Sequence, residues 1–391
     1  MVPIRTITLG VAEPHPLTAA IVRRLAQQLR AIAARLQEVG YEVQTLRLAT
    51  RPLLSDLATW PAREIERYGR ELQQMLTEVE IAFCSLGPAL VVQPTFPLER
   101  LALLADLLIA GPALSASALL ASSAQGLRQE AAPAIARLML RLARETPEGD
   151  GNFRFAMLAC VEPGCPFFPA AYHRGPASLG LGLQSAPLLG QALSAAAAEG
   201  GRPLAPDAIS AIVRRTLEEQ LGPLADLARA LSDEHQLHYH GLDLSPAPLG
   251  EESIVPALEA CGYGLIGDPG TLTVAAAITR GLQSTTLPTC GYCGLMLPVL
   301  EDALLGRRWE EGRLHVHQLL LYSAVCGTGL DTIPLPGDSS EQTIAGLLLD
   351  VAALAMRLRK PLAARLFPVP GRRAGERTTF TSPYLTNTLI R

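Results

Sequence analysis

Ile4-Arg5-Thr6-Ile7-Thr8-Leu9, followed by Gly10, opens the stretch of sequence that decides the fold class. Apolar and polar residues alternate in it, and several are β-branched, which is typical of a strand. Apolar residues then recur at three- and four-residue intervals over 18–39, which predicts an amphipathic helix. Three further elements follow in the same rhythm: a strand over 41–48, a helix over 61–78 and a strand over 80–84. This alternation predicts an α/β fold with parallel strands.

The rest of the chain continues the mixture of strands and helices. The pattern over 98–143 is helical throughout, interrupted by Gly111-Pro112 and by the region of Ser122-Ser123. Further strands are predicted over 153–160, 236–243 and 362–367, and further helices over 205–231, 253–261, 271–282, 315–325 and 343–359. No linker is longer than about eight residues. We therefore expect one domain over 1–391, with the first strand paired inside the main sheet.

Composition excludes several classes of protein. Of 391 residues, 49% are apolar and 18% are charged. This composition can form a large core and argues against disorder. The net charge of −4, with no basic block, argues against nucleic-acid binding. The N-terminus lacks the zones of a signal peptide, and polar or breaking residues interrupt the longest apolar stretch, 101–121, so no membrane segment is predicted. Seven irregularly spaced cysteines predict no disulfide framework. We expect a cytoplasmic protein with a small-molecule ligand; whether it forms homo-oligomers stays open.

Candidate catalytic residues follow the predicted strands, because the carboxyl ends of strands are the usual active-site positions in α/β folds. Four places qualify: Glu162 with His173 a loop away, Asp243 with Ser245, the adjacent pair Glu301 and Asp302, and Cys326 with Asp331 beyond a glycine-rich turn. Each has a structural alternative. The first pair could cap a loop, the second could form a turn, and the acids could favour a helix N-terminus. Cys326 is assigned to packing in preference to reactivity, because no base can be paired with its thiol.

Two possible metal motifs are rejected. Cys290 and Cys293 have the spacing of one zinc knuckle, but His315 and His317 are too close together to complete a finger. The cluster of His235, His238 and His240 spans both faces of one strand. There is also no phosphate-binding glycine loop and no serine-hydrolase elbow, which disfavours the common nucleotide-binding and hydrolase classes.

Four segments together resemble a known family. They are the first strand with Gly10, the segment Pro166–Gly175 (PFFPAAYHRG), Leu242–Pro248 (LDLSPAP) and Cys326–Pro334 (CGTGLDTIP). In order and spacing they are similar to the domain of unknown function 711 family, also called uncharacterised protein family 0210. The resemblance implies a ten-stranded α/β barrel surrounded by helices, like that of pyruvate formate-lyase and other glycyl radical enzymes. It implies no established reaction. The stretch 378–384 lacks the glycine that such enzymes need, so radical chemistry is not expected.

These observations lead to one functional hypothesis and one alternative. The hypothesis is an enzyme acting on a small polar metabolite, with Glu162, His173, Asp243, Asp331 and Cys326 as catalytic candidates and Ser245, Arg174 and Glu301 as substrate contacts. Converging carboxylates repel one another, so a divalent metal (Mg²⁺, Mn²⁺ or Ca²⁺) could be held by Glu162, His173, Asp243 and Asp302. The alternative is a non-catalytic ligand-binding or regulatory protein on a degenerate barrel.

Overall fold

Ten strands form one mixed sheet in the computed structural model, which describes residues 1–200 and 203–391. The strands are β1 (Ile4–Gly10), β2 (Leu46–Ala49), β3 (Phe83–Ala89), β4 (Leu114–Ser122), β5 (Gly126–Leu127), β6 (Phe155–Ala159), β7 (Ser178–Leu183), β8 (His238–Asp243), β9 (Gly329–Pro336) and β10 (Leu362–Val369). Their order is β8-β7-β1-β2-β3-β4-β6-β10-β9, with β5 paired to β4. β1 is parallel to β2 and antiparallel to β7, so it lies inside the sheet, as the sequence predicts.

The sheet is not closed into a complete barrel. Its edge strands, β8 and β9, do not pair with each other. The segment 288–299 lies between them instead, where Thr289 forms a bridge with Leu242 of β8 and Pro298 forms one with Asp331 of β9. The ten strands implied by the family resemblance are confirmed, but an irregular segment takes the place of the last pairing.

Glycines allow this segment to touch the turn before β9. A Cβ atom built on Gly294 would lie 2.1 Å from the Cα atom of Gly327, far inside van der Waals contact. Two backbones can approach this closely only where neither residue carries a side chain. The glycine-rich turn predicted after the helix over 315–325 is therefore needed for packing.

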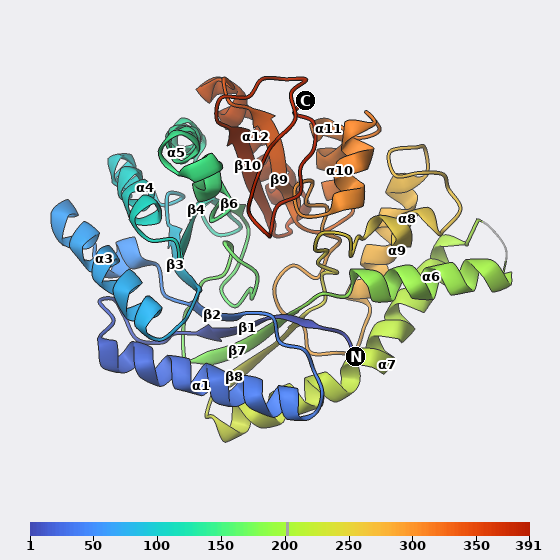
Figure 1. Cartoon of the computed structure of the whole chain (residues 1–391), viewed down its shortest axis with the longest axis horizontal. Helices are drawn as coiled ribbons and strands as arrows, with labels where there is room; N and C mark the ends of the chain where they lie inside the picture. Colours follow the sequence, from blue (N-terminus) through green and yellow to red (C-terminus); the bar gives the residue numbers. More distant parts are fainter. Residues whose placement is uncertain (201–202) are drawn as a thin grey trace.

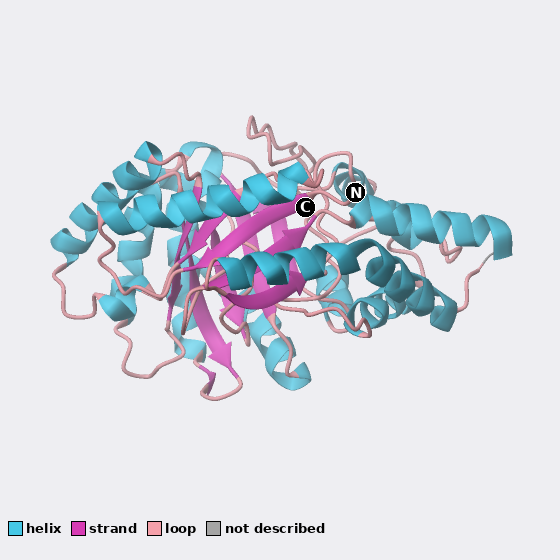
Figure 2. Ribbon diagram, turned by 90° about the horizontal axis from the view of Figure 1, so that it is seen from below, coloured by secondary structure: helices cyan, strands magenta, loops and turns pink. Residues whose placement is uncertain are grey.

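The helices surround the sheet on its outside (Figures 1 and 2). They are α1 (Ala19–Glu38), α2 (Leu53–Asp56), α3 (Ala62–Glu78), α4 (Leu101–Ala110), α5 (Ala132–Glu145), α6 (Ala186–Gly200), α7 (Pro206–Glu234), α8 (Val255–Glu259), α9 (Thr271–Gln283), α10 (Ala303–Glu310), α11 (Val316–Ser323) and α12 (Glu341–Leu358), with short 3-10 turns at Leu98–Arg100, Gln129–Ala131 and Pro147–Asn152. In α1, the Thr18 side chain caps the N-terminus, and one apolar face is buried. Among the described helices, none is long and apolar enough to cross a membrane.

One predicted element is wrong. The stretch 98–143 is not helical throughout, because its middle forms β4 between α4 and α5. The sequence of β4, LSASALLAS, is rich in alanine and leucine, which favour helices, and eight of its nine residues are buried. A strand covered on both faces loses the alternation that marks a half-exposed strand. The helical prediction failed for that reason.

The segment 160–175 folds back into the concave side of the sheet. The Thr8 hydroxyl of β1 donates to the Pro166 carbonyl at 2.8 Å, and the Ser85 hydroxyl of β3 donates to the Ala171 carbonyl at 2.6 Å. Apolar side chains of this segment pack against Tyr292 and Met296 of the segment 288–299 in a cluster separate from the main core. Two irregular segments therefore fill much of the interior, and a cavity lies beside them.

The buried His15 gives the fold a predicted pH dependence. Its Nδ1 lies 2.7 Å from the Tyr68 hydroxyl and its Nε2 lies 2.8 Å from the Thr50 hydroxyl. Burial lowers the pKa of His15 from 6.5 to about 4, so the folded protein holds the ring neutral. Because the folded pKa is below the unfolded one, the stabilisation is complete above pH 6.5 and is lost as pH falls toward 4. We expect a loss of up to about 1.4 kcal/mol per pH unit relative to His15→Gln in denaturant unfolding. Parallel pH profiles for the two proteins would contradict this role.

Candidate functional site

A cavity of about 90 Å³ lies inside the sheet, next to the two interior segments. Four strands each place one charged side chain on it: Arg5 from β1, Arg47 from β2, Asp331 from β9 and Arg365 from β10. Arg5 and Arg47 are each the second residue of their strand. The cavity is therefore near the amino ends of β1 and β2, whereas the sequence predicts a site at the carboxyl ends of strands.

Arg365 is the centre of a buried ion network. Its Nη2 lies 2.5 Å from Glu301 Oε1 and its Nε lies 2.5 Å from Asp331 Oδ1. Arg5 adds a longer contact, 3.8 Å, to Glu301 Oε2. Burial lowers the pKa of Arg365, but the charges of Asp331 and Glu301 outweigh that effect and the net shift is upward. The two carboxylates are thus held apart from each other by a shared guanidinium.

Arg47 has no such partner. It is 7% exposed, and its Nε donates to the Thr45 hydroxyl at 2.9 Å. Its two terminal nitrogens form no hydrogen bond or ion pair with any residue of the described chain. Burial, followed by the nearby positive charge of Arg5, lowers the pKa of Arg47 to about 9. An anion bound in the cavity would favour the charged form of Arg47 and so oppose both the burial and the repulsion from Arg5.

Further polar atoms of the cavity wall also lack partners. The hydroxyls of Ser115 and Thr328 are fully buried and have no hydrogen-bond partner among the described residues. Buried polar groups are nearly always paired, so these two hydroxyls are available to a ligand or an ordered water in the cavity. The carboxylate of Asp331 also has one oxygen available to a ligand. Its Oδ1 is held by Arg365, whereas its Oδ2 bonds to no described residue.

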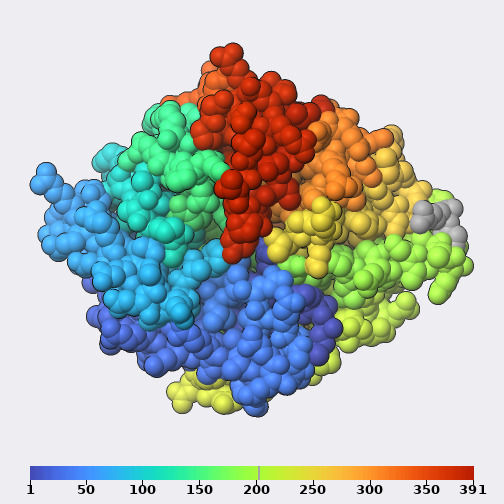
Figure 3. All heavy atoms as spheres, in the orientation of Figure 1, coloured from blue at the N-terminus to red at the C-terminus, as the bar shows by residue number. Residues whose placement is uncertain are grey.

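Aromatic rings form much of the remaining wall. The Arg47 guanidinium carbon lies 4.8 Å from the centre of the Phe83 ring and 5.1 Å from that of Phe168. Tyr384 stacks on Phe153, with ring centres 5.9 Å apart. Tyr384 belongs to the C-terminal stretch, whose atoms reach the middle of the face shown in Figure 3. The C-terminal stretch therefore covers one side of the cavity.

Two of the predicted site residues line this cavity: Glu301 and Asp331. The others do not. Glu162 and Arg174 are exposed. His173 is 1% exposed and lines a separate small cavity with His240, where its ring nitrogens contact the Ser178 hydroxyl and the Gly175 carbonyl. The predicted common pocket of Glu162, His173, Asp243 and Asp331 is thus not formed.

Asp243 is fully buried and organises the segment 288–299. Its carboxylate accepts hydrogen bonds from the Ser245 backbone and hydroxyl, the Tyr292 backbone and the Cys293 backbone. Burial raises the pKa of Asp243, and these hydrogen bonds oppose the increase. Ser245, also fully buried, faces Asp243 and not the cavity. Both residues shape the cavity indirectly, because this segment carries Tyr292 and Met296 into its wall.

Asp302 has a local role that the sequence analysis considered. It is the N-cap of α10, accepting from the Leu305 backbone at 2.9 Å and from the Ile254 backbone at 3.0 Å. Its partners in the predicted metal site are elsewhere. Among the described residues, no group of three or more His, Cys, Asp or Glu side chains is arranged to hold a metal ion. The predicted divalent-metal site is therefore not assembled, since Glu162 faces solvent while Asp243 and Asp302 are occupied by backbone N–H groups.

Cys326 lies three residues after the end of α11 and is 2% exposed. Burial raises the pKa of its thiol to about 12, with a smaller opposing effect from Lys360. Lys360 donates to the carbonyl oxygens of Ser323 and Cys326. The burial supports packing, the role that the sequence analysis favours for this cysteine.

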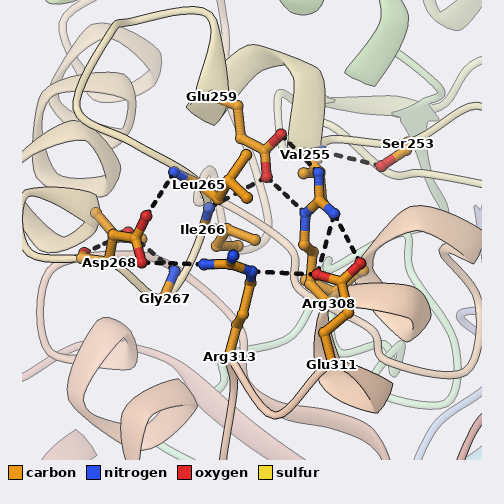
Figure 4. A network of polar contacts seen from close by, with 12 residues as sticks. Ser253, Val255, Glu259, Leu265, Ile266, Gly267, Asp268, Arg308, Glu311 and Arg313 are labelled. Carbon is orange, nitrogen blue, oxygen red and sulfur yellow. Dashed lines mark hydrogen bonds and ion pairs between the residues drawn. The ribbon is translucent and has the colours of Figure 1, made fainter.

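A second charged cluster, outside the sheet, provides a contrast (Figure 4). Arg308 binds both oxygens of Glu259 and also Glu311, and Arg313 joins Glu311 to Asp268. Each of the two arginines has at least two carboxylate contacts here. This cluster holds the loop that precedes α9 against α10. Both of its guanidinium groups have carboxylate partners, whereas the guanidinium of Arg47 has none among the described residues.

The arginines of the cavity were missed by the sequence analysis. Arg5 and Arg365 lie within strands that the sequence predicts, as does Arg47. A single charged residue in a strand that is otherwise uncharged is the available signal. Such a residue marks a polar position on one face of the strand. Because helices cover the outside of the sheet, a charged side chain on the concave side can line a binding site.

Comparisons with known proteins agree on one family. The family model described as "Uncharacterised ACR (DUF711)" matches residues 1–381. A UPF0210 protein of Pyrobaculum islandicum is 29% identical, with the alignment covering 91% of this chain and 79% of that protein. One from Desulfovibrio desulfuricans is 27% identical, covering 96% and 88%. One from Pyrobaculum aerophilum is 35% identical, but over only 57% of this chain and 51% of that protein.

A solved structure shows a distant similarity. An anaerobic ribonucleotide reductase aligns over 98% of this chain and 76% of its own, with a TM-score of 0.48 and 11% sequence identity. A similarity of this degree carries no argument about chemistry.

Proposed function

This chain belongs to the DUF711 family, and we propose that it is an enzyme that binds a small anionic metabolite in the cavity and transfers a proton from it. The observation that supports this most is Arg47, which is only 7% exposed and whose two terminal nitrogens bond to no described residue. A buried charge without a partner is costly, and such groups concentrate at binding and catalytic sites.

The charge balance of the cavity supports an anionic ligand. Arg154, on the wall, is paired with Asp150 outside it. Arg5, Arg47 and Arg365 then face only Glu301 and Asp331. Three positive groups against two negative ones leave one positive charge uncompensated, at Arg47. A ligand anion placed there would complete the balance.

Asp331 is the residue that we assign as proton acceptor. Arg365 holds its Oδ1 and fixes the carboxylate, while Oδ2 remains without a partner among the described residues. A proton leaving an O–H or C–H group of the ligand would form a bond to Oδ2, and the bonding electron pair would stay on the ligand. The positive groups nearby would stabilise the negative charge that develops there. This role retains one of the acid–base residues predicted from the sequence.

The test combines binding and turnover. Small organic acids are screened by thermal shift, because a ligand of the folded state raises Tm by mass action. Acids that bind are then incubated with the protein in D₂O and followed by proton NMR for deuterium incorporation or new products. We expect Arg47→Met to abolish the Tm increase, and Asp331→Asn to retain most of it while losing the NMR change. Arg174→Ala, an exposed arginine, is the matched control and should behave as the wild type.

Two results would contradict the proposal. If Arg47→Met binds the acids as tightly as the wild type, the cavity is not the binding site. If the acids bind through Arg47 but show no exchange or conversion, the protein binds them without catalysis, which is the alternative that the sequence analysis left open.

A further inference from the structure

We infer that the ligand of this cavity is a small monocarboxylate whose body is flat and largely apolar, apart from the O–H or C–H group that faces Asp331. This inference rests on the proposed anion site and specifies its ligand. It depends on three features of the wall: the single uncompensated charge, the way in which the Arg47 guanidinium is held, and the aromatic residues around the remaining space.

The charge count selects a monoanion. One uncompensated positive charge remains once Arg365 and Arg5 are assigned to Glu301 and Asp331. A carboxylate supplies one negative charge and makes the cavity neutral. A phosphate monoester carries nearly two at neutral pH. Its second charge would then lie close to Glu301 and Asp331 without a partner, which disfavours it.

The free donors of Arg47 suit a carboxylate. Its guanidinium carbon lies within 4.8 Å and 5.1 Å of the ring centres of Phe83 and Phe168, so aromatic groups occupy its surroundings. Its Nε is bonded to Thr45, which leaves the two terminal nitrogens free. Two adjacent N–H donors match the two oxygens of a carboxylate in a bidentate pair.

The size and the wall set the body of the ligand. The cavity, of about 90 Å³, is larger than a single water molecule requires, so it has room for a small molecule. Phe153, Tyr384 and Tyr292 line it, together with Met296 and alanine residues. Flat aromatic walls favour a planar apolar group by stacking or edge contact. Benzoate, which is small and flat and carries one carboxylate, meets these requirements.

The test compares three probe anions on the full-length protein by calorimetric titration: benzoate, cyclohexanecarboxylate and inorganic phosphate. We expect benzoate to bind at least about tenfold more tightly than either of the others. Arg47→Met should weaken benzoate by about 100-fold, because the buried partner of the carboxylate is gone. Arg47→Lys, which keeps the charge but loses the paired donors, should restore only part of the affinity. Arg174→Ala should leave it unchanged.

Folding is not expected to confound this comparison. Arg47 is an unpaired buried charge, so its replacement by Met should leave Tm without ligand equal or higher. If phosphate binds more tightly than benzoate and the binding depends on Arg47, the carboxylate inference is wrong while the anion site stands. If cyclohexanecarboxylate binds as tightly as benzoate, the inference of a flat ligand body is wrong. If none of the three probes depends on Arg47, the anion site itself fails.

Discussion

Arg365→Met is expected to destabilise the protein by about 3–5 kcal/mol, measured by denaturant unfolding at pH 7. The side chains of Arg365, Glu301 and Asp331 are 11%, 9% and 12% exposed. Removing the guanidinium leaves two buried carboxylates facing each other, with only the longer contact from Arg5 to Glu301 remaining. Breaking a buried ion pair from one side costs this much because the remaining charge is left unpaired in a medium of low polarity.

Arg308→Met is the matched control for that variant. Arg308 also joins two carboxylates, but one of them, on Glu311, is 45% exposed. Water solvates that carboxylate after the substitution, so we expect the smaller loss of about 1–2 kcal/mol. Equal losses for the two variants would mean that the cavity network is solvated and not a buried charge system.

Asp243→Asn is expected to cost about 2–3 kcal/mol in the same measurement. Oδ1 of Asp243 accepts from the Ser245 backbone and hydroxyl and from the Cys293 backbone, while Oδ2 accepts from the Tyr292 backbone. An asparagine has one accepting oxygen, so its NH₂ group must face one of these N–H donors. The lost contact leaves buried donors unsatisfied, and no water can reach a fully buried site.

Asp338→Asn, at an exposed position, controls for the removal of a charge and should change stability by less than about 0.5 kcal/mol. If Asp243→Asn is as stable as this control but has lost turnover, Asp243 acts in the chemistry, as the sequence alone suggests. A loss of stability together with weaker ligand binding supports the role in shaping the segment 288–299.

The sequence predicts the elements that present a regular apolar pattern and misses those that do not. α1 and β1 were found because one shows a helical stripe and the other alternates. β4 was missed because it is buried on both faces and composed of helix-favouring residues. The closure of the ring by 288–299 depends on contacts far apart in sequence, such as Gly294 with Gly327, which no local pattern encodes.

The candidate site was predictable only in part, for a similar reason. Glu301 and Asp331 stand out because acids follow or begin apolar stretches, and the structure places both on the cavity. Asp243 has the same local signal but is used by backbone N–H groups. Arg47 looks like an ordinary polar residue of an alternating strand. Its assignment as an anion-binding residue depends on which face of the strand is enclosed and on the absence, among the described residues, of a carboxylate paired with it.

The most direct test of the central claim, an anion bound by Arg47 inside the sheet, is a crystal structure of the protein grown with benzoate and phosphate both present. The account predicts density for a benzoate carboxylate within hydrogen-bonding distance of the two terminal nitrogens of Arg47, with its ring against Phe83, Phe168 or Tyr384. A cavity that holds only water under these conditions, with both anions absent from Arg47, would contradict it.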